Sequence, residues 1–400
     1  MSTPTPSLPF DRPDPLRPPA VYAELRRRAP VAEVTTPDGR RAWLVTSYDA
    51  AVAALTDPRL TMTPPGGGTA GDTTLFQDGE PHTRLRGLVA KAFTPRSVAA
   101  LRPRVREMAD DHVAALAAAG PPADLVAGLA APLSLQVISV LLGVAIDERE
   151  RFHALVEAFG AVEHSAGDDR EGVAEALRAW NEFTGYAAGL VAAKRRAPGD
   201  DLLSALIRVR DTGDERLTDD ELVGMVATLV AAGYQTARNA IAVGTVQLVT
   251  GGLLAGLADA PGRMEGVVEE VLRRLAGVIA EPFPRWARTG LELAGAPIAA
   301  GDLVLVRLEA ANHDPACFTD PGRFLPGRFP SGRPSRHPHL TFGRGPHHCL
   351  GASLARVELA AAFDALARRL PGLRLRVPPE DLDWVRGETD AGPASVPVTW

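Results

Sequence analysis

The stretch Phe342-Gly343-Arg344-Gly345-Pro346-His347-His348-Cys349-Leu350-Gly351 surrounds one cysteine with three glycines. Apolar residues then recur at helical spacing, which predicts a helix that begins just after Cys349: Leu350, Leu354, Val357 and Ala361. Backbone N–H groups and the positive end of that helix dipole favour a thiolate over a thiol. Gly343 and Gly345 allow a tight turn and let a flat ligand approach the backbone. The residues therefore predict a thiolate loop that suits a soft metal.

Two other interpretations of Cys349 stay open on the residues alone. A free cysteine beside a Gly-rich turn is commonly buried and inert. A zinc site is the other alternative, because four histidines are close by: His337, His339, His347 and His348. Zinc normally takes a second pair of ligands at a defined spacing, and no second cysteine is near.

The composition excludes several classes of protein. A formal charge of −6 argues against a nucleic-acid binder, and 46% hydrophobic residues in 400 can form a large core. Two cysteines cannot form a disulfide framework, which fits a reducing cytoplasm. The Pro-rich lead, residues 1–19, lacks the layout of a signal peptide. The uncharged run Leu125–Ile146 is interrupted by proline, glutamine and glycine, so we expect a buried helix and no membrane span.

The cysteine loop resembles the haem-binding loop of the cytochrome P450 family, because it meets the pattern Phe-Gly-x-Gly-x-His-x-Cys-x-Gly at every position. The resemblance implies that Cys349 is the axial thiolate of the iron in haem b, with Phe342, Gly343 and His347 beside the cofactor. It also implies the family's fold, mainly α with small β-sheets. In that triangular helical prism the haem lies between a long central helix and the Cys-loop helix, and residues 1–400 form a single domain.

A second informative stretch runs from Asp78 to Arg96. His82 and Arg86 are four residues apart and share one helix face, which is ordinarily a solvated basic face. The stretch also resembles the P450 segment His-x-x-x-Arg, whose side chains bind haem propionates, a match that suits carboxylates. The family usually has Pro-Pro-Glu/Asp before the histidine, whereas this chain has Gly79-Glu80-Pro81.

A long helix is predicted to begin at the capping signature Thr218-Asp219-Asp220-Glu221 and to reach about Val249. Its middle reads Ala231-Ala232-Gly233-Tyr234-Gln235-Thr236-Ala237. Gly and Thr cost stability inside a helix, so either a functional kink or an ordinary buried helix with one tolerated glycine fits.

This segment resembles the oxygen-binding groove of the P450 long helix, usually Ala-Gly-x-Asp/Glu-Thr-Thr. Gly233 and Thr236 match, Gln235 replaces the acid and Ala237 replaces the second Thr. In the family the Thr hydroxyl and water deliver protons during oxygen activation, and the acid assists. Glutamine can orient water but cannot exchange a proton near neutral pH. Gln235 is the main departure from the family pattern.

Further positions follow from the resemblance alone. Glu270 and Arg273 match the family's Glu-x-x-Arg, which locks to a later arginine, here Arg328, as a structural unit. Arg285 matches an arginine that meets a haem propionate. The segment 390–393 would supply a last turn into the pocket. The expected substrate-pocket residues are Phe76, Val230, Val278, Ile279 and Ala280.

Coarse periodicity predicts the other elements. Helices are expected at 21–28, 48–55, 101–119, 125–143, 147–162 and 172–195, and two strands at 31–34 and 42–45 around the turn 36–40. The family's chain order implies that the loop 165–169 belongs to a lid over the substrate.

The implied function is a haem-thiolate monooxygenase that inserts one oxygen atom of O2 into a small organic molecule, typically a secondary metabolite. Electrons would come from NAD(P)H through a separate ferredoxin and reductase, because the chain has no flavin or iron–sulfur sequence. Arg84, Lys91 and Arg344 are candidates for a ferredoxin docking face. We expect a monomer. Two alternatives remain: atypical P450 chemistry (coupling, ring closure or peroxide-driven oxidation), suggested by Gln235, and a non-catalytic haem-binding protein.

Overall fold

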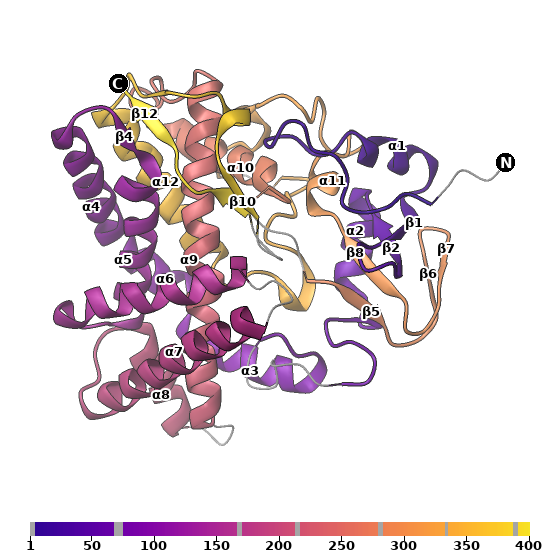
Figure 1. Cartoon of the computed structure of the whole chain (residues 1–400), viewed down its shortest axis with the longest axis horizontal. Coiled ribbons are helices and arrows are strands. Elements are labelled where there is room, and N and C mark those ends of the chain that lie inside the picture. Colours follow the sequence, from indigo (N-terminus) through magenta and orange to yellow (C-terminus); the bar gives the residue numbers. More distant parts are fainter. Residues whose placement is uncertain are drawn as a thin grey trace.

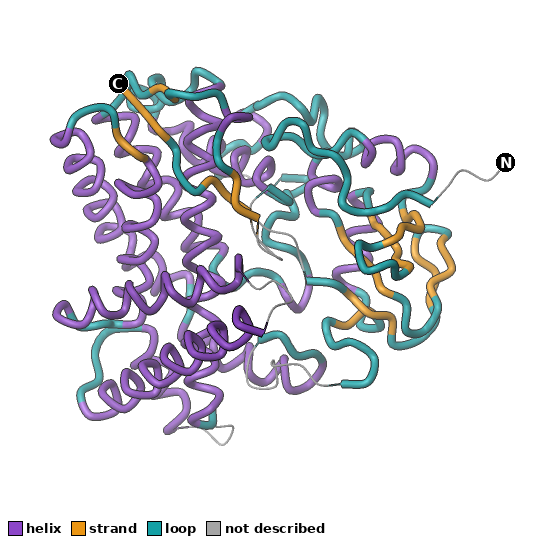
Figure 2. Tube along the Cα trace, in the orientation of Figure 1, coloured by secondary structure: helices purple, strands orange, loops and turns teal. Residues whose placement is uncertain are grey.

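The computed structural model describes residues 5–67, 75–165, 170–212, 217–278, 283–332, 335–386 and 391–400. Helices gather in one half of the molecule and most strands in the other (Figures 1 and 2). The helical half contains α4 (Pro95–Ala119), α5 (Ala131–Leu142), α6 (Arg149–Ser165), α7 (Arg170–Arg196), α8 (Leu202–Thr212), α9 (Asp219–Thr250), α10 (Met264–Leu275) and α12 (Ala352–Arg369). The main hydrophobic core lies among these helices.

The strand-rich half is built on a five-stranded sheet of order β1-β2-β8-β5-β3. Its strands are β1 (Val31–Thr35), β2 (Arg41–Val45), β3 (Leu60–Thr61), β5 (Arg285–Ala287) and β8 (Leu303–Val306). β1 and β2 form the antiparallel hairpin predicted around residues 36–40, and β8 joins β2 in parallel. A second hydrophobic cluster covers this sheet together with α2 (Tyr48–Thr56).

Smaller elements complete the fold. Three minor sheets pair β4 (Ala123–Asp124) and β9 (Arg374–Leu375) with β12 (Pro397–Thr399), β6 (Leu291–Leu293) with β7 (Ala296–Ile298), and β10 (Trp384–Arg386) with β11 (Ala391–Pro393). The remaining helices are α1 (Val21–Arg28), α3 (Gly79–Ala92) and α11 (Leu308–Asn312). The prediction of a mainly helical chain with small sheets is confirmed.

The predicted helices agree with the structure except in three places. α4 begins at Pro95 rather than at residue 101, because Thr94 and Ser97 form a capping box there. The run expected as one helix over 125–143 is a π-helical turn, Val126–Ala130, followed by α5. The amphipathic helix α8 was not predicted. Within the described residues, no helix is both long and apolar enough to cross a bilayer.

The long helix α9 has the predicted start. Thr218 and Glu221 exchange side-chain-to-backbone hydrogen bonds of 3.1 and 2.7 Å. All 32 residues of α9 are α-helical with no π-helical turn among them, which fits the interpretation of an ordinary helix with one tolerated glycine. A Cβ on Gly233 would lie 3.0 Å from the Cδ1 atom of Ile138 on α5. The glycine therefore permits close packing of α5 on α9.

Glu270, Arg273 and Arg328 form the structural unit that the sequence predicts. Glu270 and Arg273 are completely buried. Two Arg273 nitrogens donate to the Glu270 carboxylate at 2.9 Å each, and Arg328 donates at 3.2 Å. Arg273 also donates to the carbonyls of Asn312 and Pro321 at 2.7 and 2.8 Å. Such a buried pair is stable only when its hydrogen bonds are satisfied, and removal of one partner typically costs about 3–5 kcal/mol.

Asn312 connects this ion-paired unit to the cysteine loop through hydrogen bonds. Its Nδ2 atom donates to the Arg273 carbonyl and to the Thr341 hydroxyl at 3.0 Å each, and its Oδ1 atom accepts from the Leu340 amide at 2.7 Å. The Thr341 hydroxyl donates to the Leu272 carbonyl at 2.7 Å. α10 and α11 thus hold the backbone directly before Phe342.

Glu358 on α12 is a buried acid without a polar contact. Its side chain is 5% exposed, its Oε2 atom has no hydrogen-bond partner, and burial raises its pKa to about 8. The folded protein therefore holds this proton more tightly than the unfolded chain does. The stabilisation of the folded state by proton binding at Glu358 is complete below the ordinary pKa of 4.5, and it is lost as the pH rises to about 8.

We expect Glu358→Gln to remove this pH dependence. The free energy of unfolding, measured in urea at pH 5 and pH 8, should fall less with pH in the variant than in wild type, by up to about 1.4 kcal/mol per pH unit. Glu292→Gln, on the exposed middle residue of β6, is the control and should follow wild type. Parallel pH profiles for Glu358→Gln and wild type would contradict the assignment.

Candidate functional site

The cysteine loop is a set of tight turns between Leu340 and α12. The Gly343 amide donates to the Leu340 carbonyl at 2.7 Å, and the Cys349 amide donates to the Phe342 carbonyl at 2.8 Å. α12 begins at Ala352 after the cap residue Gly351, as the apolar spacing predicts. Cys349 therefore lies just before the helix N-terminus.

Cys349 is accessible to solvent, although much of the protein surrounds its thiol. Burial raises the pKa of its thiol. The backbone amides of Gly351 and Ala352 and the charges of Arg86 and Arg356 act in the opposite direction without overcoming burial. The helix terminus therefore favours the thiolate, as predicted, but burial outweighs its effect on the pKa. A metal cation bound to the sulfur would supply the missing stabilisation.

A cluster that the sequence did not indicate supports Phe342. The Arg356 guanidinium lies 4.7 Å from the Phe342 ring centre and donates to the Glu269 carboxylate at 3.0 Å. The Nε2 atom of His339 lies 3.2 Å from the same carboxylate. Burial alone would raise the pKa of Glu269, but His339 and Arg356 lower it to about 2. Glu269 adjoins Glu270, so neighbouring acids on α10 hold the loop at two points.

Of Gly343 and Gly345 in the cysteine loop, Gly345 has the less room for a side chain. Its φ is +78°, and a Cβ there would lie 2.7 Å from the Leu55 carbonyl oxygen at the end of α2. Gly343 also has a positive φ, +69°, but its nearest neighbouring atom would be 3.8 Å away. Both glycines make the predicted turns, while Gly345 in addition lets the loop contact α2.

His82 and His347 meet beside this loop, with ring centres 4.1 Å apart. Asp78 lies next to them. Its Oδ1 atom is 3.2 Å from the Nε2 atom of His347, and its Oδ2 atom accepts the amides of Met62 and Thr63 at 2.9 and 3.0 Å. Burial alone would raise the pKa of Asp78, but these bonds hold it well below its usual value. A permanently charged carboxylate thus anchors His347, a contact that the sequence did not indicate.

His82 is buried, and its Nε2 atom has no hydrogen-bond partner. Burial, with the charges of His347 and Arg86, lowers the pKa of His82 to about 4, so the ring is neutral near pH 7. A buried polar atom without a partner is unfavourable unless a ligand supplies one. His82 therefore presents a nitrogen ready for a ligand at this site.

Arg285 and Arg86 add two cationic side chains. Arg285 is 4% exposed, and its hydrogen bonds to described residues reach only the carbonyls of Phe283 and Pro284, at 2.7 and 3.4 Å. Burial lowers its pKa, and the Asp78 charge partly offsets this. Arg86 donates to the His348 carbonyl, directly before Cys349. The predicted partners of haem carboxylates thus lie beside the thiol.

The donor set fits haem better than zinc. His82, Arg285 and His347 offer nitrogen donors for carboxylates, and Cys349 offers one soft metal ligand. In the described part of the chain, no group of three or more His, Cys, Asp or Glu side chains could hold a metal ion. His339 and His347 contact Glu269 and Asp78 instead. The zinc alternative therefore has no support.

On α9, Thr236 shares one face with Ala232 and Leu229, which precede it by four and seven residues. Ala232 is exposed and Leu229 and Thr236 are partly exposed, and several neighbouring residues of α9 are partly exposed as well. The Thr236 hydroxyl donates to the Ala232 carbonyl at 2.6 Å. Val230 lies about 120° around the helix from Thr236 and is completely buried in the core. Leu229, rather than the predicted Val230, belongs to the accessible face.

The other predicted pocket residues have different outcomes. Phe76 packs against Phe283, with ring centres 4.7 Å apart, and Phe283 is 41% exposed. Val278 is 3% exposed and belongs to the main core, which contradicts its prediction as a pocket wall. Ile279, Ala280 and residue 390 lie outside the described residues, as does the predicted lid loop 165–169 apart from Ser165, which is the last residue of α6.

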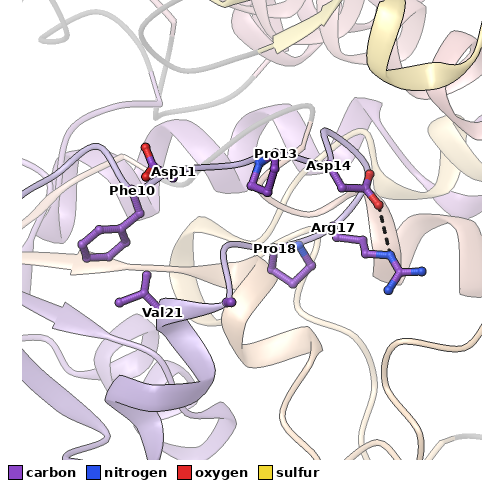
Figure 3. A pocket seen from close by; sticks show the side chains of 8 residues that line it. Phe10, Asp11, Pro13, Asp14, Arg17, Pro18 and Val21 are labelled. Atoms are coloured by element: carbon purple, nitrogen blue, oxygen red, sulfur yellow. Dashed lines mark ion pairs between the residues drawn. The ribbon is translucent and has the colours of Figure 1, made fainter.

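A hollow of about 560 Å³ lies elsewhere, on the N-terminal lead. Figure 3 shows its lining, with Asp14 paired to Arg17 at 3.1 Å and the apolar Phe10 and Val21 opposite. None of the predicted site residues lines it. We do not assign the active site there.

One of the three residues predicted for the ferredoxin docking face, Arg84, makes an ion pair within the protein. Arg84 pairs with the carboxylate of Glu221, which is buried at the start of α9. Its charge therefore serves to join α3 to α9. Lys91 and Arg344 are exposed and remain available to a partner.

Comparisons with known proteins match nearly the whole chain. The family model described as "Cytochrome P450" matches residues 264–381. The chain is 39% identical to mycinamicin IV hydroxylase/epoxidase of Micromonospora griseorubida, over 95% of this chain and 94% of that protein. It is 40% identical to cytochrome P450 monooxygenase PikC of Streptomyces venezuelae, over 95% and 90%. The solved structure of Streptomyces peucetius CYP105P2 with a biphenyl compound superposes with a TM-score of 0.89 at 36% identity, covering 100% of each chain.

We expect Gly345→Ala to destabilise the protein more than Gly343→Ala. A left-handed alanine costs about 1–2 kcal/mol at either position, and at Gly345 the new methyl group also meets a backbone carbonyl that cannot move aside freely. Urea unfolding of the two variants gives the comparison. Equal losses of stability would show that the contact with α2 does not constrain the loop.

Proposed function

The chain belongs to the cytochrome P450 family, and we therefore propose that Cys349 is the axial ligand of its haem b. The enzyme is a haem-thiolate monooxygenase, an oxidoreductase that uses O2. The observation that carries the assignment of Cys349 is its place in the structure. Cys349 is accessible, while its backbone is fixed by Phe342 and, through Leu340 and Asn312, by the buried ion pairs.

Bound through a thiolate, haem supplies the activation of O2. The residues of this chain bind and orient that group. We assign His82, Arg285 and His347 to its carboxylates, because they are nitrogen donors gathered beside the thiol. Asp78 keeps His347 in place through its bond to Nε2. Arg86 lies between these donors and the loop, and its charge stabilises the thiolate form of Cys349.

We assign Thr236 to the oxygen side of the site. Its hydroxyl, which donates to the Ala232 carbonyl, accepts a further hydrogen bond from water and can pass a proton by rotation about its Cβ–Oγ1 bond. Gln235 can orient such water but cannot replace the proton that Thr236 gives up. The replacement proton must then come from bulk water or from a polar group of the substrate.

The substrate that fits best is a small organic molecule of secondary metabolism, because the names of both relatives point to such chemistry or to monooxygenation. Leu229, Phe76 and Phe283 make the accessible surroundings largely apolar. We further propose that a ferredoxin and its reductase deliver electrons from NAD(P)H. The whole chain would act as one cytoplasmic domain and as a monomer.

The reduced protein should give a strongly red-shifted Soret band with carbon monoxide, and Cys349→Ala should lose it. Cys317→Ala is the matched control, because burial raises the pKa of the Cys317 thiol to about 11 and it stays protonated. Retention of the band in Cys349→Ala, or its loss in Cys317→Ala, would overturn the ligand assignment.

A second candidate function rests on Gln235. Coupling, ring closure or peroxide-driven oxidation demands less proton delivery than hydroxylation does, and the family acid is absent. Thr236→Ala should lower the fraction of NADH consumption that yields product if the enzyme hydroxylates, because the proton relay is lost. Product per O2 and per NADH, measured for wild type and variant, decides. No loss with Thr236→Ala and turnover with peroxide alone would favour the second candidate.

A further inference from the structure

Arg238 stands two residues after Thr236 and contacts the C-terminal hairpin. Its Nη2 atom donates to the carbonyls of Pro393 and Ala394 at 3.2 and 3.3 Å, and its Nη1 atom donates to Asn239 Oδ1 at 2.7 Å. Bonds from a charged donor are stronger than neutral ones, and the Asn239 contact orients the guanidinium. Arg238 thus joins α9 to the end of β11.

Asn239 makes a second junction with the same hairpin. A Cβ on Gly392 would lie 2.2 Å from the Asn239 Oδ1 atom, so β11 rests directly on α9. β10 and β11 pair over only three residues, and a two-stranded ribbon of this size is marginal by itself. The hairpin therefore depends on α9 for its position, because β11 contacts that helix.

The hairpin carries an apolar side chain on the face turned toward α9. Val385 is directly opposite Gly392 in the pairing, and opposite residues of an antiparallel pair point to the same face. Gly392 faces Asn239, so Val385 is on the helix side of the ribbon, and it is 38% exposed. An exposed apolar group beside the helix that carries Thr236 is placed to orient a substrate.

Helix geometry connects this contact to Gln235. Residues 235 and 238 are three apart and are neighbours on the helix surface. A carboxylate at position 235 would therefore pair with the Arg238 guanidinium and compete with the carbonyls of Pro393 and Ala394 for it. A neutral glutamine leaves the guanidinium on the hairpin.

We propose that Arg238 is a positioning residue that fixes the β10–β11 hairpin, and with it Val385, relative to Thr236. Gln235 stands where the family has an acid because an acid would draw Arg238 away. The inference rests on the proposed function, in which Thr236 faces the oxygen side, and it identifies a determinant of substrate orientation. Arg238 acts through the hairpin and need not touch the substrate.

Hydrogen–deuterium exchange of the haem-loaded protein tests the contact directly. In Arg238→Ala, amide exchange in peptides covering 383–386 and 391–396 should rise roughly tenfold, the change expected for loss of a charge-assisted bond. Arg238→Lys keeps the charge but lacks the planar guanidinium, so amide exchange should rise less in this variant. Arg28→Ala, which removes an exposed ion pair in α1, is the control and should match wild type.

Gln235→Glu should raise hairpin exchange as Arg238→Ala does, and the double variant should exchange no faster than Arg238→Ala alone. Wild-type exchange in Arg238→Ala, or fully additive effects in the double variant, would overturn the proposal. If Arg238→Ala does not fold, Arg238→Lys and Gln235→Glu provide the test. Unchanged amide exchange of the hairpin in both variants would overturn the proposal.

A binding readout separates positioning from simple structural support. Arg238→Ala should weaken binding of 4-phenylimidazole, followed by its Soret shift, and leave imidazole binding unchanged, because only the larger probe reaches Val385. Arg238→Lys should restore part of the affinity. Equal losses for both probes would assign Arg238 a merely structural role. The carbon-monoxide spectrum of each variant, which reports Cys349 alone, shows separately whether the proposed function stands.

Discussion

The buried carboxylate of Glu270 is the constraint on which the rest of the site depends. It is shared by Arg273 and Arg328, so a single acid joins α10 to the segment after α11. Neither Glu270 nor Arg273 contacts water, and both are stable because every strong donor and acceptor finds a partner. Through Asn312 the same unit orients the backbone that enters the cysteine loop. The position of Cys349 thus follows from ionic contacts made far from it in sequence.

Around that loop the charges are arranged in pairs with different tasks. Glu269 binds Arg356 and His339, and Arg356 in turn contacts the Phe342 ring. Asp78 binds His347 and the backbone amides of Met62 and Thr63, directly after β3. Both acids stay ionised although they are partly buried. The donors on Arg285 and His82 are left to meet a ligand. Acids thus serve the scaffold, while nitrogen donors and one thiol serve the cofactor.

The same division explains α9. One face packs on α5 through Gly233, a second carries the partly exposed Thr236 and Leu229, and a third binds the C-terminal hairpin through Arg238 and Asn239. A regular helix can serve three neighbours because successive residues project about 100° apart. The small residue at Gly233 therefore lets α5 pack closely on α9.

The residues by themselves determined the local features: the turns and helix start around Cys349, the capped start of α9, the hairpin of β1 and β2, and the i, i+3 pairing of Glu270 with Arg273. These depend on backbone preferences and on neighbours within a few positions, which a sequence displays directly. Only the tertiary structure decided the long-range contacts. It buried Val230 and Val278, paired Arg84 with Glu221, raised the pKa of the Cys349 thiol, and brought Asp78 to His347. Each of these depends on which distant segment covers a side chain, and burial or a distant charge can outweigh any local preference.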